Sequence, residues 1–483
     1  MPLRTRSLRL TGAALAALSL AACATVGPDF QAPAGPTGPA ADRYVMNGDS
    51  MPANAHLAPE SRAAGPWWGA FGPETLDQTI RLALADSPTI AEARATLERA
   101  RAQAAAARGA ELPQVDATAG AQRERINTQS FGFTGFPSPT INLYEVGASV
   151  SYDLDLFGGR RRATERAEAR AEQAAREADA AYLTLSANIA AQAVRIAGLR
   201  AQIDAQRSVI NEDNAIADIV AKAQEAGGEA PSATTGVRAQ LAEDEALLPP
   251  LQRQLAQARH QLALLVGKSP AEWTAPDFAL TEFRVRGEVP FSLPSQLVRR
   301  RPDILAAEAE LHAATAAIGV AVADQYPDLR LTAGLTQGSI QPENLFNYSA
   351  TGWSLLAGAT APVFHGGALK AQRAAAEAEA RASLARYQQT VLRAFVQVSD
   401  VLVALRSDGD QIAAAQRARA AAEARYKDAE VAYRLGGGAL MQLIDAQRQL
   451  GRARRGFAEA EAQRYADLVE LYAATAADWR AEQ

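Results

Sequence analysis

At residues 151–169 the sequence reads SYDLDLFGGRRRATERAEA. Its first half alternates apolar and polar side chains, as a strand with one apolar face does, and its second half repeats every three to four residues, as a helix does. Only Gly158 and Gly159 separate the two patterns. We therefore predict a strand that bends directly into a helix.

That helix is predicted to be very long, and the chain contains two of its kind. No proline interrupts residues 162–225 or residues 369–435, and both stretches are rich in alanine and charged residues. At about 1.5 Å per residue, each makes a rod on the order of 90 Å long. A glycine turn ends each rod, and return helices are expected over residues 231–266 and 440–477. The pattern predicts two antiparallel coiled-coil hairpins, in which alanine allows close approach of the helices.

Four segments alternate with a period of two, which is typical of strands that have one apolar face. They cover residues 115–121 and 143–157 in the first half of the chain and residues 329–335 and 353–363 in the second. The loops within each pair are rich in glycine and aromatic residues.

The two halves of the chain follow one plan. Pro88 and Pro302 are 214 residues apart, and so are Pro113 and Pro327. Glycine pairs recur at nearly the same offset, namely Gly158 with Gly366 and Gly227 with Gly436. Four landmarks in register indicate an internal repeat in which each half reads helix, strand, loop, strand, very long helix, turn, helix.

The N-terminus has the features of an export signal. Arg4, Arg6 and Arg9 precede an apolar run that is too short to span a membrane as a helix. The run ends in LAAC, which resembles a bacterial lipobox. Cys23 is the only cysteine, so no internal disulfide can form in an oxidising compartment, and a thioether to lipid explains it better. We expect N-palmitoyl and S-diacylglycerol groups on Cys23, and Ala24 favours sorting to the outer membrane.

Composition argues against several functional classes. The formal net charge is −5, and no basic run with interleaved aromatic residues is present, so nucleic acid is not an expected partner. The four histidines are scattered, without a second ligand at metal spacing or a paired nucleophile. We therefore expect no catalytic residue, no metal site, no cofactor apart from the covalent lipid, and no enzymatic activity.

The strands raise the question of how their sheet is completed. A soluble antiparallel sheet is the common reading of such strands, but the export signal, the lipid anchor and the lack of a compact covering layer of helices favour a membrane wall. Four strands in lipid leave two edges of unpaired amides, each costing several kcal/mol. One chain cannot close that sheet, whereas three copies would supply twelve strands and room for a water-filled lumen.

Several motifs resemble those of the outer membrane efflux protein family, in particular TolC-like lipoproteins of the OprM or NodT type. They cover nearly the whole mature chain and read VGPDF, WWGAFG, RRRPDILAAEAEL and AYRLGGGALMQLIDAQRQL. The resemblance implies a mixed membrane α+β fold: a homotrimer with a 12-stranded outer-membrane β-barrel, continued by a 12-helix periplasmic α-barrel, with two structural repeats per chain. It also implies a periplasmic adaptor and an inner-membrane transporter of the resistance-nodulation-division (RND) type as partners.

This plan divides the chain into six parts. They are a lipoprotein signal peptide (1–22), a lipidated extended tether (23–66), a first repeat (67–270, with a β-hairpin at 113–158 and a helical tip near 227), a linker (271–290), a second repeat (291–478, with a β-hairpin at 327–366 and a tip near 436) and a C-terminal tail (479–483).

The resemblance also implies a periplasmic gate at the second tip, formed by Tyr433, Met441, Asp445 and Arg448. The last three are spaced i, i+4, i+7 and share one helical face. Threefold symmetry would turn each into a ring, and three Asp445 carboxylates would attract cations unless salt links such as those from Arg448 offset them. The alternative is an ordinary surface salt bridge worth about 0–1 kcal/mol. Gln442 stands where TolC-like channels have a second acid.

The glycines at the tips have a structural role and, by resemblance, a docking role. Glycine supplies the positive φ that a helix reversal needs. The same positions resemble the ends that dock an adaptor, namely Gly227, Gly228, Gly436, Gly437 and Gly438. Pro302 is expected at the first turn of a helix. For Arg160, Arg161 and Arg162, contact with lipid head groups and a solvated surface are both open.

The sequence thus favours a passive outer-membrane duct that is anchored by lipid, extends into the periplasm and carries drugs and other toxic small molecules out of the cell. The outer-membrane channel of a type I protein secretion system is an alternative with the same architecture. A lipid-anchored periplasmic coiled-coil scaffold is an alternative of another class. The scaffold needs no apolar-faced strands, and it predicts a lipoyl-like domain at a hairpin tip, for which the short glycine turns leave no room.

Overall fold

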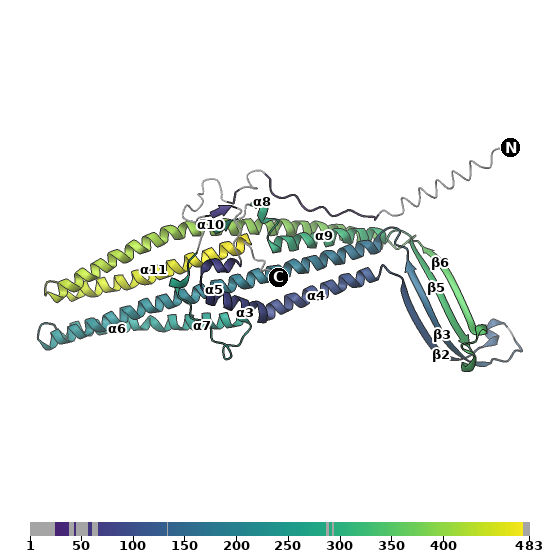
Figure 1. The fold of residues 1–483 in the computed structure, drawn as a ribbon, viewed down its shortest axis with the longest axis horizontal. Coiled ribbons are helices and arrows are strands. Elements are labelled where there is room, and N and C mark those ends of the chain that lie inside the picture. The colour runs from purple at the N-terminus through teal and green to yellow at the C-terminus, as the bar shows by residue number, and fades with distance from the viewer. Residues whose placement is uncertain are drawn as a thin grey trace. The chain divides into compact units, whose positions relative to one another are not determined.

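The computed structural model describes residues 25–37, 43–44, 57–59, 66–132, 134–285, 289–291 and 294–476 of the 483-residue chain (Figure 1). Cys23, the signal peptide and residues 479–483 lie outside the described residues. The chain divides into two compact units. The sheet unit comprises Met1–Pro33, Thr96–Ala174 and Ala306–Tyr387, and the helix unit comprises Ala34–Ala95, Ala175–Leu305 and Gln388–Gln483.

The sheet unit contains one antiparallel sheet of four strands in the order β2-β3-β5-β6 (Figure 1). The strands are β2 (Gln114–Arg125), β3 (Thr140–Asp153), β5 (Asp328–Ser339) and β6 (Thr351–Thr360). The four strands predicted from the alternating sequence pattern are therefore confirmed. Strand β3 of the first repeat pairs with β5 of the second repeat. The two repeats therefore form one continuous sheet.

The predicted strand over residues 143–157 is wrong at its C-terminal end, because β3 stops at Asp153. Residues 154–157 form the turn into α5 (Gly159–Glu225). The Asp155 carboxylate accepts hydrogen bonds from the backbone N–H groups of Arg160 (3.1 Å) and Arg161 (3.0 Å). Asp155 thus satisfies the free donors at the start of the helix, which an alternation of apolar and polar letters does not reveal. Gly158 adopts the left-handed conformation in this turn, with φ at +78°.

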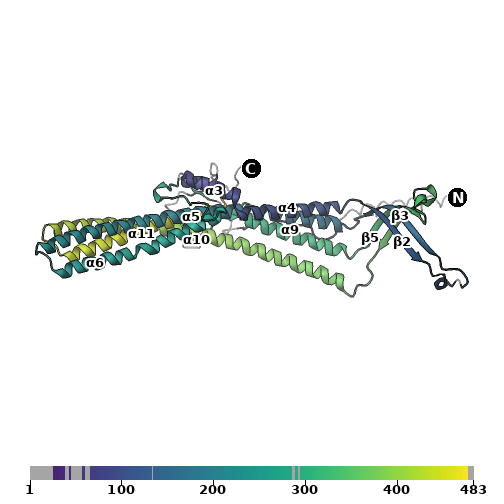
Figure 2. The same ribbon diagram turned by 90° about the horizontal axis from the view of Figure 1, so that it is seen from below.

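Both long helices are confirmed, since α5 and α10 (Ala368–Arg434) have 67 residues each. Shorter helices precede the strands in each repeat, namely α3 (Glu74–Asp86), α4 (Pro88–Gly109), α8 (Pro294–Leu297) and α9 (Pro302–Ala323). The final return helix is α11 (Leu440–Thr475). In both ribbon views α10 and α11 run side by side to one tip, and α5 and α6 (Pro231–Ala246) run to another (Figures 1 and 2).

The prediction of one unbroken return helix over residues 231–266 is wrong. The structure divides it at Leu247 into α6 and α7 (Leu248–Val266). Pro249 and Pro250 have no backbone N–H to donate to the carbonyls four residues earlier, so the hydrogen-bond ladder is interrupted there. The first repeat therefore differs from the second, whose return helix α11 is continuous.

Aromatic side chains form a buried cluster in the helix unit. They lie in a short 3₁₀ helix, η1 (Trp67–Phe71), and on α11. The ring of Trp67 stacks on Tyr472 at 5.7 Å, Phe71 meets Tyr472 edge-on at 5.4 Å, and the indole N–H of Trp67 donates to Ser186 on α5. All three rings are fully buried, and they fix the end of α11 against α5.

Short elements complete the described chain. Strand β1 (Leu57–Pro59), within the predicted tether, pairs in parallel with β4 (Val289–Phe291) in the helix unit. Further 3₁₀ turns are η2 (Thr128–Phe131), η3 (Leu280–Glu282), η4 (Pro342–Asn344) and η5 (Tyr348–Ala350). Among the helices described, α9 alone is long and apolar enough to cross a membrane, but half of its most apolar window is buried in the protein. It is therefore a packed core helix.

Candidate channel-forming site

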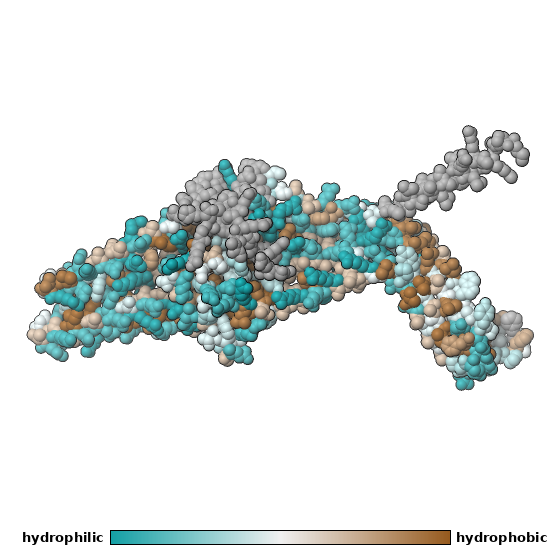
Figure 3. Space-filling view, in the orientation of Figure 1, coloured by the Kyte–Doolittle hydropathy of each residue, from teal (hydrophilic) through white to brown (hydrophobic). Residues whose placement is uncertain are grey.

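The pairing register brings the predicted apolar residues onto one face of the sheet. Val115 pairs with Val150, Val150 with Ala333, and Ala333 with Leu355, so these side chains point the same way across all four strands. Hydrophobic residues gather over the strands in the space-filling view (Figure 3). Trp353 and Leu355 are 80% and 76% exposed. The opposite face carries mostly small and polar side chains, such as Ser149 beside Gly334, and its apolar exceptions are Ile141, Leu143 and Leu356.

Within the described residues the sheet has two free edges, because β2 and β6 each pair on one side only. All three pairings are antiparallel, so β2 and β6 run in opposite directions. Copies of such a sheet can be joined edge to edge with every contact antiparallel. An apolar, solvent-facing surface with open edges is the arrangement expected of one segment of a membrane barrel.

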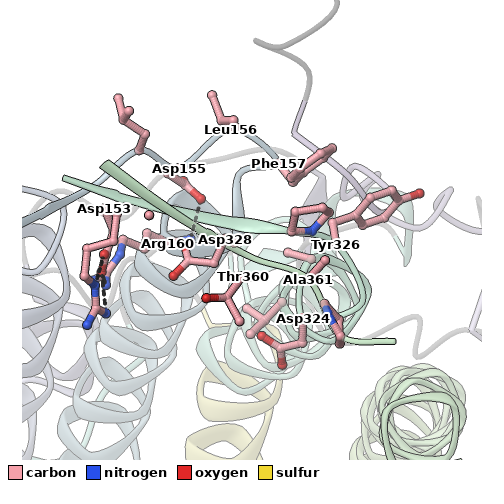
Figure 4. A pocket seen from close by; sticks show the side chains of 18 of the residues that line it. Asp153, Asp155, Leu156, Phe157, Arg160, Asp324, Tyr326, Asp328, Thr360 and Ala361 are labelled. Atoms are coloured by element: carbon pink, nitrogen blue, oxygen red, sulfur yellow. Dashed lines mark hydrogen bonds and ion pairs between the residues drawn. The ribbon is translucent and has the colours of Figure 1, made fainter. Parts of the chain in front are cut away.

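A cavity of about 780 Å³, lined by both charged and apolar side chains, lies where the strands meet the helices of the sheet unit (Figure 4). Asp153 and Arg160 point toward one another there and form an ion pair. Asp153 also pairs with Arg330 on β5, with Oδ1 at 2.6 Å from Nε. Arg160 donates in addition to the carbonyl of Ala110, so the end of α4 is tied to the start of α5.

These contacts assign a carboxylate partner to each of the three consecutive arginines. Arg160 pairs with Asp153, Arg161 pairs with Asp155, and Arg162 is 96% buried with its guanidinium group bound to internal acceptors. Each positive charge is matched by a carboxylate of the same unit. The burial of Arg162 contradicts both interpretations for that residue, whereas the side chains of Arg160 and Arg161 are 37% and 41% exposed, so both interpretations stay predictions for these two.

Glycines make both hairpin tips possible. Gly227 and Gly436 have φ angles of +81° and +78°. The N–H of Gly228 donates to Ala223 O at 2.8 Å, and the N–H of Gly437 donates to Ala432 O at 3.0 Å. A Cβ on Gly438 would lie 2.9 Å from the backbone nitrogen of Tyr433, which is too close. The tip glycines therefore have a conformational role whatever binds to them.

The structure brings the two tips together through Tyr433. Its hydroxyl donates to Glu229 of the other tip at 3.1 Å, and burial, with the Glu229 carboxylate, raises the pKa of Tyr433. A cluster of apolar side chains below this bond also joins the hairpins, and it comprises Ile216, Val220, Val237, Leu443 and Ile444. Glu229 had no signal in the sequence, because only the fold places it beside residue 433.

The four gate residues predicted from the sequence are not all brought together. Met441 is exposed, and Tyr433 is engaged with Glu229. Arg448, named above as one residue that could offset the Asp445 charge, forms no ion pair with Asp445 among the described residues. Asp445 instead pairs with Arg425 of α10 at 2.7 Å and accepts from Gln449 at 3.1 Å. The facing helix supplies the cation, which periodicity within α11 could not indicate.

Arg448 lies at a separate small cavity, together with Asp244, Arg452 and Arg455. The lining of this cavity also includes Glu243, so acidic and basic side chains meet there. The structure thus separates the predicted apolar, acidic and basic positions into different local surroundings.

Arg301, in the RRRPDI motif, is a positioning residue whose contacts only the fold reveals. It forms a two-pronged pair with Asp303, with distances of 2.9 and 2.7 Å. It also donates to Gln397 of α10 and to the carbonyl of Ala474 near the end of α11, both at 3.0 Å. Arg301 therefore ties the start of α9 to two other helices, and Pro302 is the first residue of α9 as expected.

Each long hairpin contains a buried carboxyl pair that joins its two helices. Asp213 of α5 lies beside Asp244 of α6, and Asp408 of α10 lies beside Asp467 of α11. Burial raises the pKa of Asp213 and of Asp408 to about 7 in each case, and the neighbouring carboxyl adds to the effect. At neutral pH both pairs are therefore partly protonated.

Comparison with known proteins identifies the family that this sequence matches. The sequence matches the profile of the family described as "Outer membrane efflux protein" over residues 79–268 and 293–477. It is 29% identical over 473 residues to the pyoverdine export outer membrane protein OpmQ of Pseudomonas putida, covering 96% of both chains. It is 29% identical over 468 residues to the cation efflux system protein CusC of Escherichia coli, covering 96% of this chain and 97% of CusC.

A solved structure shows the same fold. The outer-membrane channel OprN superposes with a TM-score of 0.85 at 28% identity, covering 94% of this chain and all of the OprN chain. The similarity extends over both units, since so little of either chain is left out.

Proposed function

The chain belongs to the outer membrane efflux protein family, and from that membership we propose that it is the outer-membrane component of a tripartite pump, joined by a periplasmic adaptor to an RND-type transporter. It is an exit duct of an efflux system, located in the outer membrane and extending into the periplasm. The family consists of channels, so the protein conducts solutes and leaves the energy-driven step to its partners.

The observation that carries the proposal is the sheet, with one apolar face and two open edges. Unpaired amides at those edges would each cost several kcal/mol in a membrane. We propose that β6 of one copy pairs with β2 of the next, so that three copies form a 12-stranded barrel and their hairpins form a 12-helix barrel. The opposite directions of β2 and β6 support this closure, because each new junction is antiparallel like the others.

Two neighbouring residues on β6 test the membrane face. Leu355 lies on the apolar face, and Ser354 lies on the opposite one. A lysine on the lipid-facing side of a barrel costs about 2–4 kcal/mol at mid-membrane and little in the lumen. We expect Leu355→Lys to reduce the amount of trimer recovered from outer membranes and Ser354→Lys to leave it nearly unchanged. A monomeric detergent-solubilised wild-type protein, or equal losses in the two variants, would refute the barrel.

The solutes carried are proposed to be small molecules. OpmQ is named for pyoverdine export and CusC for cation efflux, and both match this chain over nearly its whole length. These relatives favour efflux of small solutes over type I protein secretion. A coiled-coil scaffold gives no reason for the apolar face of the sheet.

We further propose that Asp445 lines the periplasmic constriction and that its pairing with Arg425 keeps the constriction narrow. Tyr433 would hold the two tips of a copy together through Glu229, while Met441 and Arg448 would line the mouth. Asp445→Ala is expected to raise the single-channel conductance in planar bilayers. Arg425→Ala should also raise it while increasing cation preference, because the carboxylate is left unpaired.

An exposed acid on the facing helix α10, Asp428, supplies the control. Asp428→Ala should leave the conductance unchanged. If Asp445→Ala behaves like Asp428→Ala, Asp445 is an ordinary surface salt bridge and has no part in the gate.

The two tips are proposed as the docking ends for the adaptor. Leu435 and Met441 are 82% and 70% exposed beside Gly436, Gly437 and Gly438, so an apolar partner surface would cover them. Gly227 and Gly228 would present the first tip in the same way. Leu435→Asp is expected to weaken co-purification with the adaptor, and unchanged co-purification would exclude this contact.

We propose that Cys23 bears N-palmitoyl and S-diacylglycerol groups that anchor the mature chain in the outer membrane. The support is the lipobox and the absence of any other cysteine. Intact-mass analysis of the N-terminal peptide tests it, since a free thiol at Cys23 would exclude the modification.

A further inference from the structure

The charged side chains of the sheet are divided unequally between its two faces. The register that places Val115 on the apolar face also fixes the face of every other strand residue, because alternate residues of a strand point the same way. The apolar face carries no carboxylate on any of the four strands and only two charges, Arg123 and Arg125 of β2. All the strand acids lie on the opposite face, namely Asp116, Glu124, Glu145, Asp153 and Asp328.

Both arginines lie near the last residue of β2, at the end of the sheet that is farthest from α4 (Figure 1). Their register partners on β3 are polar, since Arg123 pairs with Asn142 and Arg125 with Thr140. Nearer α4 the same face has apolar partners, as in the pairing of Val115 with Val150. The apolar face therefore ends in a polar, positively charged margin at the β2–β3 loop.

Two tyrosines mark the limits of the apolar band below this margin. On the apolar face of β3, Tyr144 and Tyr152 enclose three apolar residues, namely Val146, Ala148 and Val150. At about 3.4 Å per residue the tyrosines are about 27 Å apart along the strand, and a tilt of about 40° reduces this to a height of about 20 Å. Barrels of the outer membrane have an apolar band about 25 Å tall with aromatic residues at both edges.

The arginines lie beyond the edge of this band. Tyr144 pairs with Ala121, so Arg123 is two positions, or about 7 Å, further along the strand, and Arg125 is about 14 Å further. This level corresponds to the head groups of a membrane rather than to its hydrocarbon. A positive charge on the outer surface of a barrel is costly at mid-membrane and costs little near the interface.

No carboxylate within the described residues neutralises the two guanidinium groups. Both side chains are exposed, and neither forms an ion pair there. The neighbouring Glu124 lies on the opposite face and accepts a hydrogen bond from Gln122 at 2.9 Å. The sequence of the β2–β3 loop, residues 126–139, contains no charged residue. Strand β6, the proposed neighbour of β2 in the next copy, contains none either.

We propose that Arg123 and Arg125 bind the phosphate groups of lipid A in the outer leaflet of the membrane. The inference rests on the proposed barrel, which places the apolar face in lipid and the β2–β3 loop at the cell exterior. Guanidinium groups bind phosphate oxygens through two parallel hydrogen bonds. The two arginines are about 7 Å apart on one face, so both reach the same head group.

The source of the phosphate follows from the level of the arginines. Phosphorylated lipid A forms the outer leaflet of an outer membrane, whereas phospholipids form the inner leaflet. Because β2 is an edge strand, each bound lipid would also lie beside a proposed junction between copies, at three equivalent places around the trimer. The site thus belongs to the outer surface of the duct and has no part in conduction.

The test counts the lipids that remain bound to the full-length trimer. The protein is purified in detergent and incubated with bisphosphorylated lipid A, and native mass spectrometry gives the number of lipids on each trimer. Arg123→Gln/Arg125→Gln is expected to retain at least fivefold less lipid A than wild type. Both residues are exposed, so the variant should assemble normally, and only trimer peaks are scored.

A second double variant is the matched control. Arg99 and Arg101 of α4 are also exposed and two positions apart, so Arg99→Gln/Arg101→Gln removes the same charge away from the strands. This variant should retain as much lipid A as wild type. Lipid A without phosphates and phosphatidylglycerol are the control ligands, and each should bind wild type at least fivefold less than bisphosphorylated lipid A.

The outcomes separate this site from the duct proposed above. Equal retention by wild type and Arg123→Gln/Arg125→Gln, or equal losses in the two double variants, would overturn the site. Equal retention of phosphatidylglycerol or of lipid A without phosphates would overturn the choice of ligand. A monomeric wild-type protein would contradict the duct itself, whereas an intact trimer that does not retain lipid A would contradict only the present inference.

Discussion

Replacing Asp408 by asparagine is expected to make the protein more stable above neutral pH. Asp408 lies on α10, is 4% exposed, and is paired with the Asp467 carboxyl of α11. Burial, together with Asp467, raises the pKa of Asp408 from its ordinary 3.8 to about 7. Asparagine keeps the shape of the side chain and cannot ionise, so it removes the cost of burying a charge without opening a cavity.

The sign and size of the effect follow from proton linkage. The folded chain holds a proton on Asp408 at pH values where the unfolded chain has lost it, so stability falls as pH rises from about 4 to about 7. Each pH unit in that window is worth about 1.4 kcal/mol, so wild type loses about 3 kcal/mol through this group between pH 5 and pH 8. The Asp408→Asn variant should lack that loss.

The assay is thermal unfolding of the detergent-solubilised protein, followed by circular dichroism at one protein concentration and several pH values. We expect the midpoint of Asp408→Asn to exceed that of wild type at pH 8 and the gap to shrink toward pH 5. Asp410→Asn, on an exposed position of the same helix, is the control and should follow wild type. A lower midpoint for Asp408→Asn at pH 8 would refute the reasoning, since it would mean that the ionised carboxylate stabilises the fold.

Two further predictions concern helix contacts. Gly451→Val should lower the unfolding midpoint by an amount equivalent to about 1–3 kcal/mol, because a Cβ at Gly451 already lies 2.7 Å from Val209 on α5. Gly456→Val, with open space around it, should cost less, and equal losses would exclude a steric cause. Arg301→Lys should lower the midpoint by the equivalent of about 1–3 kcal/mol because lysine cannot bind its carboxylate partner and the Ala474 carbonyl together; an unchanged midpoint would show that Arg301 is not a structural tie.

Much of the fold could be predicted from the sequence because its signals are local. Alternation with a period of two predicted the four strands. Long alanine-rich stretches without proline predicted the two helices, which have 67 residues each, and glycines predicted the chain reversals. The break in the first return helix was equally local, since Pro249 and Pro250 are plain in the sequence, and an unbroken helix should not have been expected there.

The candidate site likewise has features that local sequence patterns predict and features that depend on distant residues. The apolar face of the sheet was predictable, since alternate residues of one strand must point the same way. The partner of Asp445 was not, because Arg425 faces it only through the rotation and register of two helices. The same is true of Glu229 beside Tyr433.

By itself, then, the sequence determined the strands, the long helices and the turns. Only the tertiary structure decided the pairings, such as Arg162 with Asp29, which are 133 residues apart in the chain, and Asp408 with Asp467. The reason is that periodicity reports which face of an element is apolar, whereas the partner of a polar group depends on how distant elements are rotated and aligned against one another.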